Sequence, residues 1–236
     1  AKSAELAGTI VLEGAISPAD IFFSQDPISL GVVAKEGLFE TLPNDILVSV
    51  PSWASDKKGY WVGTSGRSRS LVIDTRDVTP EELPNDIYGL ADEKFRKRLG
   101  LAPTNSSFIA MVSCMIELDG EEKVLDWLSS INSLDYTEYP KNSPQVAAAD
   151  SGELDIGMVN HYYTLRLLAE TGGSSIKNVY LDSGCGAMVM PAGVGILSSS
   201  QNKTAAMAFI EFLHSKSVQE TFTNSLYEFP LVKGIE

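Results

Sequence analysis

Residues 60–74 have the sequence YWVGTSGRSRSLVID, which contains two β-rich runs hinged on Gly66. A stretch of this length is typical of strands that pass between two regions of a protein. Residues 187–197, AMVMPAGVGIL, form a second long apolar run. These two runs predict two lobes joined by crossing strands, with the middle lobe inserted into the other. A cleft between two such lobes is a common place for a ligand.

The rest of the chain alternates helical and strand patterns with short polar connections, which is the order of an α/β fold. Apolar spacing predicts helices over 3–14, 27–39, 106–120, 121–131, 143–152 and 203–215, and strands over 18–23 and 153–159. We therefore predict a first lobe made of 1–68 with 193–236 and an inserted second lobe made of 69–192.

The composition is that of a globular chain, with 236 residues of which 44% are hydrophobic. Eighteen Lys and Arg residues against 31 Asp and Glu give a net charge of −13, which disfavours binding to nucleic acid or to an anionic membrane surface. No apolar run is long enough to span a membrane, and no signal peptide opens the chain. We expect a soluble protein whose export signal is absent from this chain.

Two cysteines, Cys114 and Cys185, occur without a CxxC motif, and His161 and His214 are the only histidines. This spacing fits neither a disulfide framework nor a zinc site. Both cysteines are expected to be small packing residues.

Seven segments, in order along the chain, carry a family resemblance. They are PADIFFSQDPISLG (18–31), WVGTSGRSRSLVID (61–74), LAPTNSSF (101–108), YPKNSP (139–144), GELDIGMVNHYY (152–163), GVGILSSSQNKTAAMAFIEFL (193–213) and YEFPLVKGIE (227–236). Together they resemble the bacterial periplasmic ferric-ion-binding proteins, and the NHYY run is the most specific part. The resemblance implies the type II periplasmic-binding-protein fold. It also implies a role as the substrate-binding component of an iron(III) ABC importer, with a membrane permease and an ATPase as partners.

The resemblance further implies a ferric site in the interlobe cleft. Ferric ion is a hard cation that prefers anionic oxygen donors, and Tyr162 and Tyr163 correspond to the paired phenolate ligands of the family. Packing is the alternative role for two tyrosines. Gln25 stands where several members carry a ligand glutamate, and Asp26 beside it is either a metal ligand or the N-cap of the helix that Pro27 begins.

A synergistic anion such as phosphate or carbonate usually shares the iron in this family. Thr104, Asn105, Ser106 and Ser107 precede a helical run, where hydroxyl, amide and backbone N–H groups favour an anion, although ordinary capping explains them too. Asn142 and Asn160 correspond to anion-holding residues of the family. Arg67 resembles an arginine that some members use for carbonate, while Arg67 and Arg69 in structural ion pairs are the alternative. His161 is expected to be a spacer or surface residue.

The chain differs from the family at both ends. Members begin with further strands and a helix before the SAELAG helix and continue beyond the YEFPLVKGIE segment with a helical tail. We therefore expect an N- and C-terminally shortened member whose incomplete first lobe a homo-oligomer could cover.

Other functions remain open at this stage. An oxyanion- or phosphonate-binding protein of the same fold is one alternative, and a remnant that binds nothing is another. An enzyme on this fold lacks support, because the chain has no GxSxG, HExxH or Walker motif and only two histidines for general-base work. The preferred function is an extracytoplasmic, periplasmic carrier of ferric iron that is not an enzyme.

Overall fold

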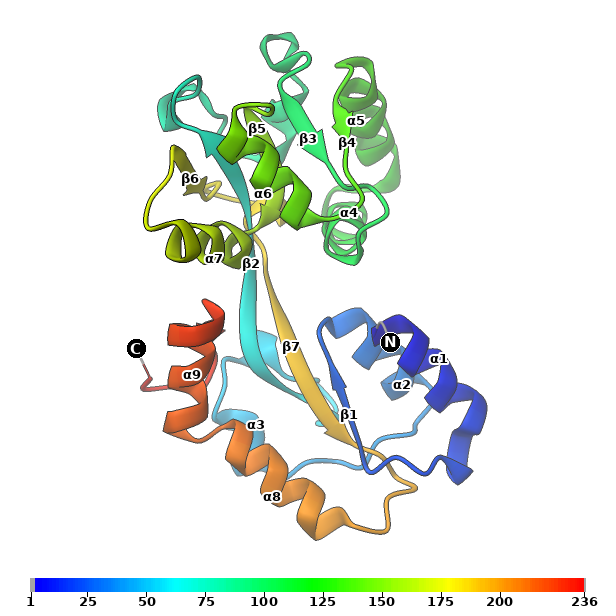
Figure 1. Ribbon diagram of the computed structural model, residues 1–236. Helices are drawn as coiled ribbons and strands as arrows, with labels where there is room; N and C mark the ends of the chain where they lie inside the picture. Colours follow the sequence, from blue (N-terminus) through cyan, green and yellow to red (C-terminus); the bar gives the residue numbers. More distant parts are fainter. Residues whose placement is uncertain (1–2, 236) are drawn as a thin grey trace. The chain divides into compact units, whose positions relative to one another are not determined.

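The chain divides into two compact units in the computed structural model, which describes residues 3–235 (Figure 1). The flanking unit consists of Ala1–Arg67 together with Met190–Glu236. The inserted unit consists of Ser68–Val189. Each unit has its own hydrophobic core, so each is described by itself below.

Two long strands, β2 (Val62–Asp74) and β7 (Val189–Ile196), contain the boundaries between the units. The predicted lobes were 1–68 with 193–236, and 69–192. Their boundaries fall within the same two strands. The predicted hinge at Gly66 is wrong, because β2 is one continuous strand in which every residue is buried. Gly66 pairs with Phe229 in an antiparallel ladder, and this pairing holds its backbone extended.

The flanking unit is built on the strand order β1-β7-β2-β8, in which β1 (Ile21–Ser24) pairs antiparallel with β7 and β8 (Phe229–Pro230) pairs antiparallel with β2. Its helices are α1 (Ser3–Glu13), α2 (Pro27–Lys35), α3 (Asn44–Val48), α8 (Lys203–Leu213) and α9 (Lys216–Leu226). Sequence periodicity predicted α1, β1, α2 and α8 close to these bounds, and it missed α9.

Helix α2 begins at the residues whose chemistry favours a helix start. Asp26 is the N-cap: one carboxylate oxygen accepts the Ser29 backbone N–H at 2.7 Å and the other accepts the Ser29 hydroxyl at 3.0 Å. Pro27 occupies the first turn, where its missing N–H costs nothing. Gly37, with φ of 68°, follows the end of the helix. The predicted capping role of Asp26 is confirmed.

The side chain of Gln219 on α9 is fully buried and joins three segments of the flanking unit. Its Nε2 donates to the carbonyl oxygens of Thr64 (2.8 Å) and Leu213 (2.9 Å). Its Oε1 accepts the backbone N–H groups of Leu231 (3.0 Å) and Val232 (3.3 Å). Both ends of the amide are satisfied, which removes most of the cost of burying it.

We expect Gln219→Ala to lower the free energy of unfolding by about 2–3 kcal/mol, because buried carbonyl and N–H groups then lose their partners. Denaturant unfolding followed by circular dichroism measures this. Gln201→Ala is the matched control, since Gln201 is exposed and its side chain makes one hydrogen bond, to the Ser199 carbonyl. Equal unfolding midpoints for the parent and Gln219→Ala would contradict the assignment.

The inserted unit is built on the strand order β6-β2-β5-β3-β4 (Figure 1). Strands β5 and β6 pair antiparallel with opposite edges of β2, and β3 runs parallel to β5 and to β4. The strands are β3 (Leu99–Leu101), β4 (Thr137–Glu138), β5 (Ile156–Asn160) and β6 (Ile176–Val179). The helices are α4 (Ser106–Asp119), α5 (Glu121–Ser133), α6 (Asn142–Ser151) and α7 (His161–Thr171). Helices α4, α5 and α6 and strand β5 follow the predicted pattern.

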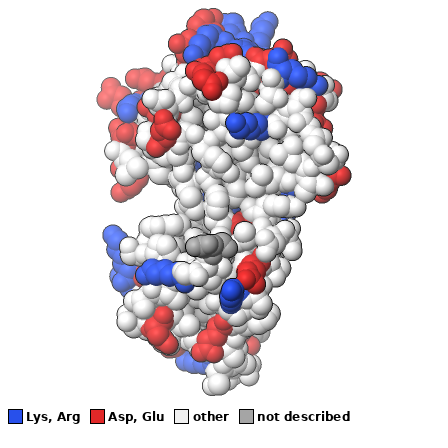
Figure 2. Space-filling view, turned by 90° about the vertical axis from the view of Figure 1, so that its left-hand side faces the viewer, with Lys and Arg blue, Asp and Glu red and all other residues white. Residues whose placement is uncertain are grey.

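Charged side chains of both signs lie next to one another on the inserted unit. They are mixed at the top of the view in Figure 2. Arg98 forms ion pairs with Asp155 and Glu82, and Arg96 forms one with Glu93. Exposed pairs of this kind contribute little to stability, so the unit depends on its apolar core.

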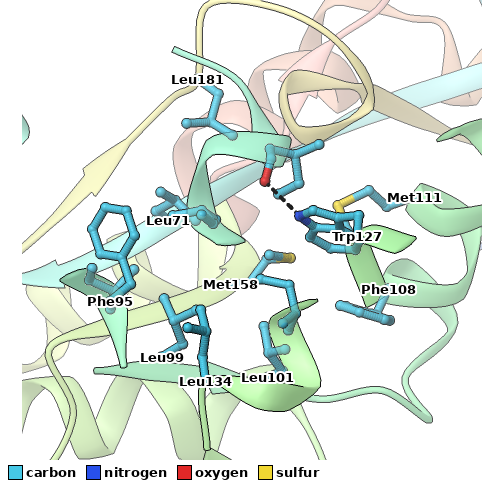
Figure 3. Close-up of a cluster of buried hydrophobic side chains, with 14 of the residues drawn as sticks. Leu71, Phe95, Leu99, Leu101, Phe108, Met111, Trp127, Leu134, Met158 and Leu181 are labelled. Carbon is cyan, nitrogen blue, oxygen red and sulfur yellow. Dashed lines mark hydrogen bonds between the residues drawn. The ribbon is translucent and has the colours of Figure 1, made fainter. Parts of the chain in front are cut away.

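The core of the inserted unit packs strands β2, β3 and β5 against helices α4 and α5 (Figure 3). Trp127 of α5 is buried in it, and its indole N–H donates to the Ile87 carbonyl at 3.1 Å. Side chains of this core are fully or almost fully buried, among them Leu71, Phe95, Leu99, Met111 and Met158. The scaffold beneath the end of β5 is therefore close-packed.

Cys114 of α4 and Cys185, which begins a short 3-10 turn (Cys185–Ala187), form a disulfide. The prediction that both are packing residues is wrong. Two cysteines 71 residues apart give no pairing signal in sequence, because the bond requires proximity in space, and here the Cα atoms lie 5.9 Å apart. The bond covalently links helix α4 to the segment that precedes β7.

Candidate functional site

Tyr162 and Tyr163 lie in the first turn of α7, directly after strand β5. Their ring centroids are 4.2 Å apart and the ring planes are tilted by 32°. Tyr162 is 8% exposed, and Tyr163 is half-buried against the core of the inserted unit. The first turn of the helix therefore holds the two phenol rings in contact with each other.

Arg69 of β2 is a fully buried arginine in the same unit. It is the direct cross-strand neighbour of Asn160 in β5. Its Nη1 donates to Asn160 Oδ1 (2.9 Å) and to Ser107 Oγ (3.1 Å), and its Nη2 donates to the Met158 carbonyl (3.1 Å). Burial lowers the pKa of Arg69 to about 10, and the charge of Tyr162 acts in the opposite direction.

Asn160 is held in one orientation by this arginine. Its Oδ1 accepts from Arg69, so its amide nitrogen is turned the other way, and that nitrogen makes no hydrogen bond to the described residues. Asn142, the first residue of α6, is also buried, and its side chain makes no hydrogen bond within residues 3–235. Both amides have unused hydrogen-bonding capacity.

The side chain of Asn105 caps the start of α4. Asn105 Oδ1 accepts the backbone N–H of Ser107 at 3.0 Å and the Ser107 hydroxyl at 2.6 Å. The Ser107 oxygen also accepts from Arg69, so its hydroxyl is fully used. Thr104 and Ser106 are exposed, and their hydroxyls have no hydrogen-bond partner in the described part of the chain. The structure thus brings Ser107 and Asn160 together through Arg69.

His161 is 1% exposed, so the predicted surface position is wrong. Its Nδ1 accepts the backbone N–H of Ser68 at 3.1 Å, and its carbonyl accepts from Asn178 at 2.8 Å. Its ring meets that of Tyr162 edge-on, with centroids 5.9 Å apart. His161 therefore fixes the start of α7 to β2 and β6.

The remaining predicted residues belong to the flanking unit. Arg67 donates to Glu228 (3.0 Å) and to the Gln25 carbonyl (2.7 Å), so it forms the buried ion pair that was its alternative role. Both carboxylate oxygens of Asp26 are used in the cap of α2. The side chain of Gln25 is exposed and makes no hydrogen bond to described residues.

Sequence reasoning treated Arg69 as a second ion-pair residue. That alternative is wrong for Arg69, which has no carboxylate partner among residues 3–235. The only hint in the sequence was an arginine inside the β-rich run 60–74. Within the same residues, no group of three or more His, Cys, Asp and Glu side chains is placed to hold a metal, so a metal site here requires other donors such as phenolates.

Comparisons with known proteins show to which family the chain belongs. Residues 17–235 match the family model described as bacterial extracellular solute-binding protein. The chain belongs to this family. It is 36% identical to the major ferric iron-binding protein of Neisseria meningitidis serogroup B, across 98% of this chain and 71% of that protein. It is 32% identical to the Fe(3+)-binding periplasmic protein of Serratia marcescens, across 98% of this chain and 69% of that one.

Solved structures of the family confirm the predicted α/β periplasmic-binding-protein fold. The iron-bound HitA of Pseudomonas aeruginosa matches with a TM-score of 0.93 and 29% identity, over 99% of this chain and 76% of HitA. The Trichodesmium protein IdiA (FutA), solved with iron and citrate, matches with a TM-score of 0.87 and 26% identity, over 100% of this chain and 78% of that chain. The predicted resemblance to ferric-ion-binding proteins is therefore confirmed.

Among the described residues, no helix has the length and apolar character needed to cross a bilayer.

Proposed function

We propose that this chain is an extracytoplasmic solute-binding protein that binds ferric iron through the phenolate oxygens of Tyr162 and Tyr163. The observation that carries the proposal is the pair of phenol rings at the start of α7, whose centroids lie 4.2 Å apart. Phenolates are hard, anionic donors suited to ferric ion. Relatives named as ferric iron-binding proteins, and iron-bound solved structures of the same fold, support it.

An anion is proposed to share the ion with the tyrosines. Among residues 3–235, the amide nitrogen of Asn160 and the side-chain amide of Asn142 have no hydrogen-bond partner, and Thr104 and Ser106 offer exposed hydroxyls at the start of α4. Asn105 and Ser107 serve chiefly to shape that helix start, because their side chains bond to each other. Arg67 is the weakest of the predicted anion residues, since its guanidinium is committed to Glu228.

The proposal includes delivery of the iron to a membrane permease with its ATPase, and membership of the solute-binding family supports it. The disulfide between Cys114 and Cys185 supports a location outside the cytoplasm, where such bonds persist. A periplasmic location is supported by the Serratia relative, which is named as an Fe(3+)-binding periplasmic protein.

Capture of a free oxyanion is the second candidate function. The buried Arg69 without a carboxylate partner favours it, because an anion would supply the missing negative charge. In this case the tyrosines would act as neutral hydrogen-bond donors.

Titration of metal-free protein with ferric citrate separates the two functions. The iron proposal requires a phenolate-to-iron charge-transfer absorption in the visible that saturates at one ion per chain. Binding of phosphate without iron, together with no visible band on adding ferric salt, would reject iron and select the oxyanion function.

A further inference from the structure

Arg69 is a buried charge with no carboxylate partner among residues 3–235. Its three hydrogen bonds go to a hydroxyl, an amide oxygen and a backbone carbonyl, all of which are uncharged. Its Nε has no hydrogen-bond partner among residues 3–235. Burying an unpaired charge is costly, and proteins keep such charges mainly where a ligand completes the pairing.

The surroundings of Arg69 connect this charge to the proposed iron site. Asn160 and Ser107, which it orients, belong to the two segments proposed to hold the anion, and Asn160 directly precedes α7, which carries Tyr162. Arg166 is the other cation near Tyr162, with its guanidinium carbon 5.0 Å from the ring centroid. Arg166 is only half-buried, so solvent screens it more strongly than Arg69.

We propose that Arg69 determines the charge of the anion that binds with the iron, selecting a dianionic oxyanion over a monoanionic one. The inference rests on the proposed function. A ferric ion with two phenolates carries one net positive charge, and Arg69 adds a second in a region of low dielectric. An oxyanion with two negative charges neutralises this assembly, whereas an anion with one leaves a buried positive charge. Arg69 is therefore a specificity-determining residue that acts without touching the iron.

Two substitutions separate the charge of Arg69 from its hydrogen bonds. Arg69→Lys keeps the positive charge, and Arg69→Gln keeps donor groups without the charge. The control is Arg98→Met, which removes an arginine of the same unit whose partners are Asp155 and Glu82. Circular dichroism establishes that each variant is folded before iron is added.

Iron retention is then measured in hydrogen phosphate and, at equal ionic strength, in nitrate. The readout is the concentration of a competing chelator that removes half of the visible charge-transfer absorption. In the parent, Arg98→Met and Arg69→Lys, phosphate should raise this concentration about tenfold over nitrate. In Arg69→Gln the ratio should fall to about threefold or less.

The outcomes that overturn the proposal are distinct from those that reject iron binding. If folded Arg69→Gln keeps the phosphate preference of the parent, the proposal is wrong. If folded Arg69→Lys loses that preference, the proposal is also wrong. The Arg69→Lys result alone decides if Arg69→Gln does not fold. If the parent protein shows no visible absorption band with ferric iron, the proposed function is wrong, and the role of Arg69 is not what failed.

Discussion

Replacing Tyr162 and Tyr163 together by Phe should abolish the visible band with ferric iron and lower iron retention by more than about 100-fold. Even loss of a residue that only orients a metal ligand commonly costs 10–100-fold in affinity, and this change removes two anionic ligands while keeping both rings. Retention is measured as the chelator concentration that removes half of the bound iron. Each single variant should keep a weakened and shifted band, because one phenolate remains.

Tyr88→Phe is the matched control for this experiment. Tyr88 is a half-buried phenol of the inserted unit whose hydroxyl donates to Asp119 at 2.8 Å. Burial and this hydrogen bond raise the pKa of Tyr88 to about 12, so it is a poor source of phenolate. Its variant should give the parent band and retention. Parent-like iron binding by folded Tyr162→Phe/Tyr163→Phe would remove the tyrosines from the site.

The fold was largely predictable because its helices and strands have clear apolar periodicity. Helix α8 and strand β7 are examples, and each lies close to its predicted range. Helix α9 was missed because few of its residues are apolar, and its buried position is filled by a polar residue, Gln219. The continuity of β2 at Gly66 depends on pairing with Phe229, far along the chain, which local sequence does not show.

The candidate site was predictable where neighbouring residues act together, as Tyr162 and Tyr163 do in one helical turn. It was less predictable where the partners are distant in sequence. Arg69 meets Ser107 and Asn160 only because β2 pairs with β5, and Arg67, two residues earlier, meets Glu228 instead. Two arginines with the same local pattern therefore have different roles. The disulfide was missed for the same reason.

Reduction of the disulfide between Cys114 and Cys185 should lower the free energy of unfolding of the inserted unit by about 4 kcal/mol. The closed loop spans 71 residues, all within this unit, so the bond removes much of the conformational freedom of the unfolded chain. Denaturant unfolding of the parent with and without a reductant measures the effect. Alkylation before reduction should label neither cysteine.

Cys114→Ala/Cys185→Ala provides the control, because it should unfold at or slightly below the midpoint of the reduced parent and show no response to reductant. Both proteins lack the cross-link, so their shared loss of stability belongs mainly to the unfolded state, and the variant also loses the packing contacts of the two sulfur atoms, of which that of Cys185 is buried. Iron retention by folded protein should change much less than stability, because neither sulfur belongs to the proposed site and Tyr162 and Tyr163 keep their positions on α7. A parent whose unfolding midpoint is unmoved by reductant would show that the bond does not form, and it would remove the main structural support for an extracytoplasmic location.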